Sequence, residues 1–104
     1  MGIASELLVV SVKVEPSVED AWNSWYDTVH LPEIAECPGF KSAQRYVATE
    51  PDGSRAYLSV YEIEGEGTLR SAEFNARRGW GPFKDKVIFK TLRYSRIAQI
   101  DGAA

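Results

Sequence analysis

The sequence contains one cysteine and one histidine among its 104 residues, and this scarcity excludes several kinds of site. Cys37 has no partner for an internal disulfide, which favours a reducing compartment, and we expect it to be a small buried apolar side chain. One histidine and one cysteine cannot supply the ligands of a zinc ion within one chain. The sequence therefore predicts neither a disulfide scaffold nor a metal site.

Long apolar runs and an excess of basic residues are also missing. No apolar run approaches the roughly 20 residues that cross a bilayer, and the first residues lack the basic region of a signal peptide. We therefore expect a cytoplasmic protein with no membrane partner. The net charge of −3 argues against nucleic acid as the main partner, because affinity for its phosphates depends on basic side chains.

The charges are unevenly distributed along the chain. Residues 1–40 carry one basic and seven acidic side chains, whereas residues 41–104 carry eleven basic and eight acidic ones. Solvated faces and weak surface ion pairs are the ordinary explanation. The alternative is a patch that favours an anionic ligand, formed by Arg77, Arg78, Lys84 and Lys86.

A chain of this length is expected to form one domain, residues 1–104. Four segments have the composition and alternation of β-strands, namely residues 6–14, 40–49, 55–63 and 87–100. The first has apolar side chains on both faces, so we expect it to be central and covered on both sides. Pro51 and Gly53 suit a tight turn, which makes the second and third strands a hairpin.

Two helices are expected between these strands. The first begins at Ser17, a good N-cap, with Asp20 as the acidic half of a capping box. Its apolar stripe at spacings of three and four consists of Val18, Ala21, Trp22, Trp25, Tyr26 and Val29. Pro32 is expected to end or kink this helix, with a short turn restarting at the proline. A weaker helix is predicted over 68–78, with Gly79 as its stop.

The resulting β-α-β-β-α-β order is that of the α+β ferredoxin-like fold, with an antiparallel four-stranded sheet. Its helices lie on one face of the sheet only. The other face also carries large apolar side chains, and so small a domain cannot leave them exposed to water. The simplest cover is a second copy of the chain related by two-fold symmetry, so we expect a homodimer.

Three short motifs carry a resemblance to a known family. The runs WYDTVHLPE at residues 25–33, PGF at 38–40 and QRY at 44–46 resemble the EthD-like branch of the dimeric α/β-barrel superfamily. The resemblance implies two subunits whose sheets close face to face into a barrel, with a pocket in each between sheet and helices. Relatives include polyketide cyclases, muconolactone isomerases, cofactor-free monooxygenases, dehydratases, heme enzymes and members with no assigned activity, so the fold does not settle the reaction.

The candidate catalytic residues are His30, Tyr26 and Asp27. His30 follows Tyr26 by four positions and Trp22 by eight, so the three project along one side of the helix. At a helix C-terminus the dipole favours the protonated imidazole, which suits a general acid or base or a donor to a phenolate or enolate oxygen. Asp27 precedes His30 by three positions and could orient it. The alternatives are a His30 that caps a backbone carbonyl and a solvated Asp27.

The candidate substrate-binding residues are aromatic, namely Trp22, Tyr46, Tyr57, Tyr61, Trp80 and Phe83. They would stack on an aromatic substrate and offer hydroxyl donors. Trp80 and Phe83 flank a Gly-Pro pair in a loop that could fold over a pocket mouth. The alternative is that these rings only pack in the core, at a dimer interface, or at the edge between helix and sheet.

Three functions remain open. The first is a small cofactor-independent enzyme, of lyase, isomerase, cyclase or monooxygenase type, that acts on an aromatic, quinone-like or lactone compound with His30 as acid or base. The second is a non-catalytic small-molecule-binding or structural homodimer. The third, heme binding, ranks lowest because the resemblance implies a later histidine as heme ligand. RNA binding is disfavoured because the strand at 55–61 lacks the Gly-Phe core of the RNA-recognition signature.

Overall fold

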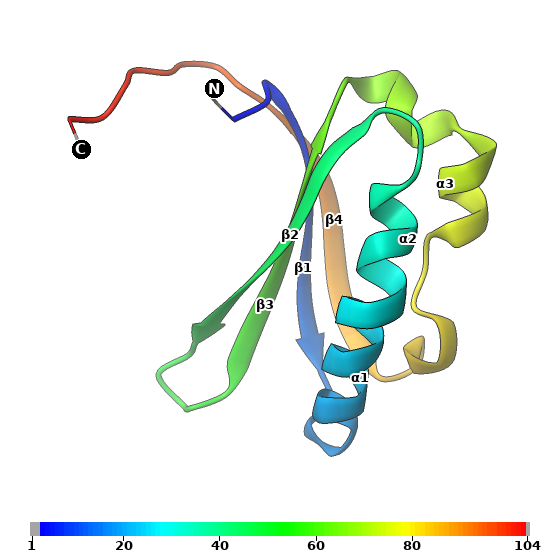
Figure 1. Cartoon of the computed structure of the whole chain (residues 1–104). Coiled ribbons are helices and arrows are strands. Elements are labelled where there is room, and N and C mark those ends of the chain that lie inside the picture. Colours follow the sequence, from blue (N-terminus) through cyan, green and yellow to red (C-terminus); the bar gives the residue numbers. More distant parts are fainter. Residues whose placement is uncertain (1–2, 104) are drawn as a thin grey trace.

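The four alternating segments pair into one antiparallel sheet, with the helices on one side of it (Figure 1). The computed structural model describes residues 3–103. The strands pair in the order β2-β3-β1-β4 and are β1 (Glu6–Val14), β2 (Phe40–Thr49), β3 (Arg55–Ile63) and β4 (Val87–Ser95). The predicted ferredoxin-like order, the hairpin of β2 and β3, and the central position of β1 are confirmed.

The last strand is shorter than predicted. It pairs along the whole of β1, from Val14 opposite Val87 to Glu6 opposite Ser95, and it ends where β1 begins. The sequence pattern continues to residue 100, but after Arg96, whose N–H bonds the Ser5 carbonyl at 2.8 Å, the described residues offer it no partner strand. Residues 96–103 form no regular structure and extend away from the helices, and Ile97 and Ile100 are almost fully exposed (Figure 1).

The first helix begins differently from the prediction. A 3₁₀ turn at Pro16–Val18 precedes α1 (Glu19–Trp25). The Ser17 hydroxyl lies inside that turn and donates to the Glu15 carboxylate at 3.0 Å. Ser17 is therefore not the N-cap, and the capping box with Asp20 is wrong. The start of the helix is set by the proline, whose fixed φ and missing N–H suit a first turn.

Pro32 does not end the helix. A π-helical turn, Tyr26–His30, follows α1 directly and runs into α2 (Leu31–Ala35). In this turn the Leu31 N–H bonds the Tyr26 carbonyl, five residues earlier, so an extra residue is accommodated next to the proline. In a regular α-helix, side chains four apart drift by about 40° per step. The wider turn reduces this drift, and four side chains at that spacing are all buried: Trp22, Tyr26, His30 and Ile34.

Arg45 fastens this helix to the sheet. Its side chain is 11% exposed and its guanidinium lies over the rings of Trp22 and Tyr26, at 4.9 and 4.4 Å from the centroids. The same group donates to Asp27 Oδ1 at 2.6 Å and to Asn23 Oδ1 at 2.7 Å. A cation over two aromatic faces with its N–H groups bonded is a strong cross-link between β2 and α1.

A register shift at the start of β2 corrects one predicted strand face. The shift lies between Phe40 and Ser42, so Phe40 does not share a face with Ser42 as the simple alternation predicts. Phe40 instead packs on the helix side, with ring centroids 5.7 Å from Tyr61 and 5.4 Å from Phe74. Cys37 is buried beside this core, as predicted.

The second helix is shorter than the predicted 68–78. A 3₁₀ turn at Glu66–Arg70 comes first, and α3 (Ala72–Arg77) starts where the Ser71 hydroxyl accepts the Phe74 N–H at 3.1 Å. Because this serine caps the helix from within the predicted range, the helix begins later than predicted. Gly79 follows the helix with φ of 112°, which fits its predicted role as a stop. A further 3₁₀ turn, Gly81–Phe83, leads towards β4.

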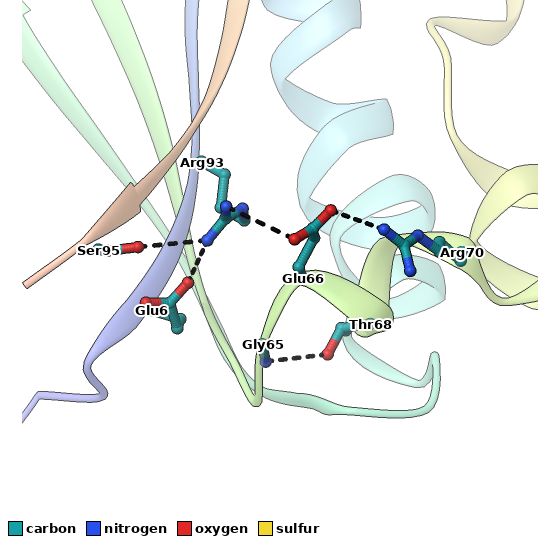
Figure 2. A network of polar contacts seen from close by, with 7 residues as sticks. All are labelled: Glu6, Gly65, Glu66, Thr68, Arg70, Arg93 and Ser95. Carbon is teal, nitrogen blue, oxygen red and sulfur yellow. Dashed lines mark hydrogen bonds and ion pairs between the residues drawn. The ribbon is translucent and has the colours of Figure 1, made fainter.

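A polar network connects the turn before α3 to the sheet (Figure 2). Arg93 on β4 bonds Glu6 on β1 and the Ser95 hydroxyl, and it lies 4.0 Å from Glu66. Glu66 in turn pairs with Arg70 at 2.6 Å. These exposed pairs are individually weak, but together they hold the chain that leads into α3 against the edge of the sheet.

No helix or strand within residues 3–103 covers the sheet face opposite the helices, and only the residues around 98–100 border it. Leu7 and Val9 of β1 point to this face and are only partly buried, so the second cover predicted for β1 stays a prediction about a partner copy. Large apolar side chains exposed on the same face are Tyr46, Ile88, Leu92 and Tyr94. None of the helices in this part of the chain has the length and apolar character needed to cross a membrane.

Candidate active site

A small cavity lies between the helix layer and the β1–β4 half of the sheet. Its volume is about 200 Å³. The sheet supplies Leu8 and Val10 from β1, Tyr61 from β3, and Phe89 and Thr91 from β4. The helices and the loop after α3 supply Tyr26, His30, Ile34, Phe74, Arg78, Gly79 and Trp80.

Trp80 closes the edge of this cavity. Phe89 lies on the edge strand β4, at the side of the cavity, and its ring lies 5.1 Å from that of Trp80. Gly79 and Gly81 on either side of Trp80 both have positive φ, which lets the loop turn the indole inward. A Cβ on Gly81 would sit 3.0 Å from the Trp25 ring, so this turn also fits closely against the helix.

His30 forms part of the wall as a neutral side chain. It is 6% exposed, its ring stacks on Trp25 at 4.8 Å, and it meets the edge of Tyr26 at 4.9 Å. Burial lowers its pKa to about 4, because the imidazolium would lose its hydration among aromatic rings. The prediction of a protonated histidine at a helix C-terminus is wrong, because the helix continues through α2. His30 also makes no side-chain capping bond there.

Tyr26 and Tyr61 form a buried hydroxyl pair. Their oxygens are 2.8 Å apart, and both side chains are almost completely buried. Burial raises the pKa of both phenols, and for Tyr61 the neighbouring Tyr26 adds to the effect. Both therefore stay protonated at neutral pH. One hydroxyl proton serves the bond between them, and the second is free for Ser59 or for an oxygen of a ligand.

The structure brings four of the predicted site residues to the cavity: His30, Tyr26, Tyr61 and Trp80. The others lie elsewhere. Trp22 is fully buried behind the wall, and Tyr57 donates to Glu19 and accepts from Asn23. Phe83 packs on the outer side of Trp25, Tyr46 lies on the opposite sheet face, and Asp27 bonds Arg45 and not His30.

Several wall residues were not predicted from the sequence. Phe89 and Thr91 lie two positions apart on β4 and pair with Val12 and Val10 of β1. Strand alternation therefore places both on the cavity side once the pairing of β4 with β1 is known. Arg78 was predicted only as part of a basic patch. Its place at the cavity depends on the path of the loop after α3, which has no local sequence signal.

Comparison with known proteins agrees with this architecture. A family model described as "Domain of unknown function (DUF4286)" matches residues 6–77, which is more than half of the chain. No curated protein matches the sequence.

Three solved structures illustrate the similarity in fold. An ethyl tert-butyl ether degradation (EthD) family protein from Bacillus halodurans has 14% identity, covers 88% of this chain and 99% of its own, and has a TM-score of 0.66. The monooxygenase ActVA-Orf6 of Streptomyces coelicolor, solved with nanaomycin D, has 18% identity over 96% and 94% of the two chains and a TM-score of 0.60. The heme-degrader MhuD from Mycobacterium tuberculosis, with two hemes in its active site, has 12% identity over 92% and 99% and a TM-score of 0.63.

These identities establish a common fold and leave the reaction open. The chain belongs to the DUF4286 family and shares the ferredoxin-like fold of these solved structures, the EthD family protein among them.

Proposed function

We propose that this protein is a small cofactor-independent enzyme that acts on an aromatic, quinone-like or lactone compound bound in the cavity. The observation that carries the proposal is a buried neutral His30 and a buried tyrosine pair that line the same cavity. Buried polar groups that face an apolar hollow are characteristic of ligand sites. Lyase, isomerase, cyclase and monooxygenase chemistry all fit this arrangement.

The roles of the side chains follow from their protonation states. A neutral imidazole can accept a proton from a phenol or from a carbon next to a carbonyl. The oxygen of the resulting phenolate or enolate would receive the free hydroxyl proton of the Tyr26–Tyr61 pair as a hydrogen bond. Apolar walls from Leu8, Ile34 and Phe74 keep the local dielectric low, which strengthens that bond.

The size of the cavity limits the substrate. An apolar cavity of about 150 Å³ in another protein binds benzene, whereas pockets for drug-sized ligands measure roughly 300 to 1,000 Å³. At about 200 Å³ the present cavity suits one ring with small substituents. A heme is larger than this space and would require the wall to move, so the geometry favours the ring compound over heme.

The experiment compares His30→Gln with the wild type on a panel of phenols, hydroquinones and unsaturated lactones. Product formation and oxygen uptake are measured, with Tyr61→Phe as a second site variant and Tyr94→Phe, on the opposite sheet face, as the control. Glutamine keeps the size but cannot take the proton, so we expect turnover to fall by about 100-fold or more. Wild-type turnover should decline only as the pH falls towards 4. Unchanged turnover in His30→Gln would show that the histidine is structural.

A non-catalytic binding protein is the second candidate. One observation favours it: the carboxylate of Asp27 is held by Arg45, so it does not face His30 as an orienting group. Binding of the same ring compounds, followed by quenching of Trp80 fluorescence, without turnover of any of them would support this alternative.

We also propose that two copies of the chain associate through the uncovered sheet face. Leu92 lies on that face and is 41% exposed, which makes Leu92→Glu a suitable probe. Sedimentation should show a dimer for the wild type and a monomer for Leu92→Glu, because a charge would be buried in the interface. Val29, equally exposed at 41% but on the helix side, gives the matched control Val29→Glu, which should stay dimeric. A wild-type monomer at micromolar concentration would rule out this interface.

A further inference from the structure

Arg78 gives the cavity its charge. Among the described residues that line it, Arg78 is the single side chain charged at neutral pH, since His30 is neutral and no carboxylate contributes to the wall. The other polar side chains of the wall are uncharged: His30, Trp80, Thr91 and the two tyrosines. The cavity therefore presents one positive charge beside an otherwise uncharged surface.

The same arginine lies at the boundary between the cavity and the outside. A surface depression is also lined by His30, Arg78 and Gly79, together with Trp25, Glu33 and Arg77. The three shared residues form the partition between the two spaces. α3 ends at Arg77, and Arg78 is extended before the positive φ of Gly79, so this partition is a loop and not a packed helix. A ligand that enters from the depression passes the Arg78 guanidinium.

The neighbouring side chains Arg77 and Arg78 differ in their contacts with the rest of the protein. Arg77 donates to the Glu33 carbonyl at 2.9 Å and lies 3.5 Å from the Glu36 carboxylate. Arg78 has no ion-pair partner within residues 3–103, and its guanidinium lies 5.4 Å from the centre of the Phe74 ring, which is itself part of the wall. The N–H groups of Arg78 are therefore available to a ligand that packs on Phe74.

We propose that the ligand of this site is a small monoanion: a single ring that carries a carboxylate. The ring fills the cavity between Phe74 and Trp80, and the carboxylate accepts two hydrogen bonds from Arg78 at the rim. A guanidinium matches a carboxylate with two parallel bonds, which fixes the orientation of the ring as well as its charge. This inference rests on the proposed function, in that the cavity must bind a ring compound.

The test compares benzoate with benzamide, its uncharged analogue of similar shape, by Trp fluorescence titration at low salt. We expect the wild type to bind benzoate about tenfold more tightly than benzamide, as one charge-assisted contact at a partly exposed rim provides. Arg78→Gln should remove this preference. Arg77→Gln, the matched control on the neighbouring side chain, should keep it. Added salt should reduce the benzoate preference.

Two other outcomes would separate this inference from the proposed function. Equal binding of benzoate and benzamide, or a benzoate preference that survives Arg78→Gln, would overturn the anion site and leave the ring-binding cavity intact. Failure of the wild type to bind either compound would also overturn the anion site, and the panel of phenols, hydroquinones and lactones would then test the proposed function on its own. Thermal unfolding of each variant checks that the fold is retained, because Arg77 contributes contacts to the helix.

Discussion

The wild-type free energy of unfolding is expected to fall by up to about 3 kcal/mol between pH 6.5 and pH 4, and the variant His30→Gln is expected to lack this fall. Burial lowers the pKa of the folded-state imidazole from 6.5 to about 4. Between these values the unfolded chain binds a proton that the folded chain does not, so the wild-type free energy of unfolding falls as the pH is lowered. Each unit of the pKa difference corresponds to about 1.4 kcal/mol.

Urea unfolding at pH 7, 5.5 and 4.5 measures this effect. Carboxylates also titrate, but at lower pH, and three of them have a lowered pKa: Asp52, through hydrogen bonds from Ser54, and Glu6 and Glu62. Hydrogen bonds from Ser95 and Arg93 lower the pKa of Glu6, and bonds from the Ser42 hydroxyl and the Ala4 N–H lower that of Glu62. Their contributions are present above the unfolded value near 4.5 and are lost below it, in wild type and variant alike. Parallel stability curves for the two proteins above pH 4.5 would contradict a buried neutral His30.

Gly39→Ala is expected to destabilise the fold by about 2–5 kcal/mol. Gly39 has φ of 83°, a conformation that costs an L-residue about 1–2 kcal/mol. A Cβ there would also lie 2.6 Å from Oγ1 and 2.9 Å from Cγ2 of Thr68. Thr68 is buried and its hydroxyl accepts the Gly65 N–H, so it cannot move aside freely. Overpacking of this kind adds about 1–3 kcal/mol.

Gly53→Ala is the control for the steric part of this effect. Gly53 has a similar φ of 89° in the β2–β3 turn, but a Cβ there meets no atom within 4 Å. Only the backbone cost of about 1–2 kcal/mol should remain. The difference between the two variants in the free energy of unfolding, measured with denaturant, therefore gives the contribution of the contact with Thr68. Equal losses of stability would show that Thr68 moves aside without destabilising the fold.

Local sequence patterns predicted the strands well because alternation is a property of each strand alone. β1, β2 and β3 have the predicted bounds, and the hairpin turn contains its own proline and glycine. The errors occur where a distant element decides the outcome. β4 ends at Ser95 because the strand β1 has no further residue to pair with it. The helix continues past Pro32 through a π-helical turn that no local sequence pattern predicts.

The residues of the candidate site also fall into those that a local pattern predicts and those that a distant contact decides. His30 and Tyr26 were predicted from their spacing of four, and Tyr61 from the alternation of β3. Asp27 has the correct spacing to reach His30, but Arg45 on β2 holds it instead. Arg78 reaches the cavity because the loop after α3 turns at Gly79. Both results depend on contacts between elements that are remote in the sequence.

The π-helical turn at Tyr26–His30 has a consequence for how relatives are compared. The same residues wound as a regular α-helix, without the wider turn, would rotate α1 by about 100° relative to α2, and Trp22 would leave the sheet while Ile34 stayed on it. Deleting one exposed residue from this turn, such as Thr28, removes the extra residue, so a regular α-helix would then keep Trp22 and Ile34 on the same side. A homologue with a one-residue gap here can therefore present the same helix face to the sheet. A gap at this position is thus no evidence against transferring the site to another sequence.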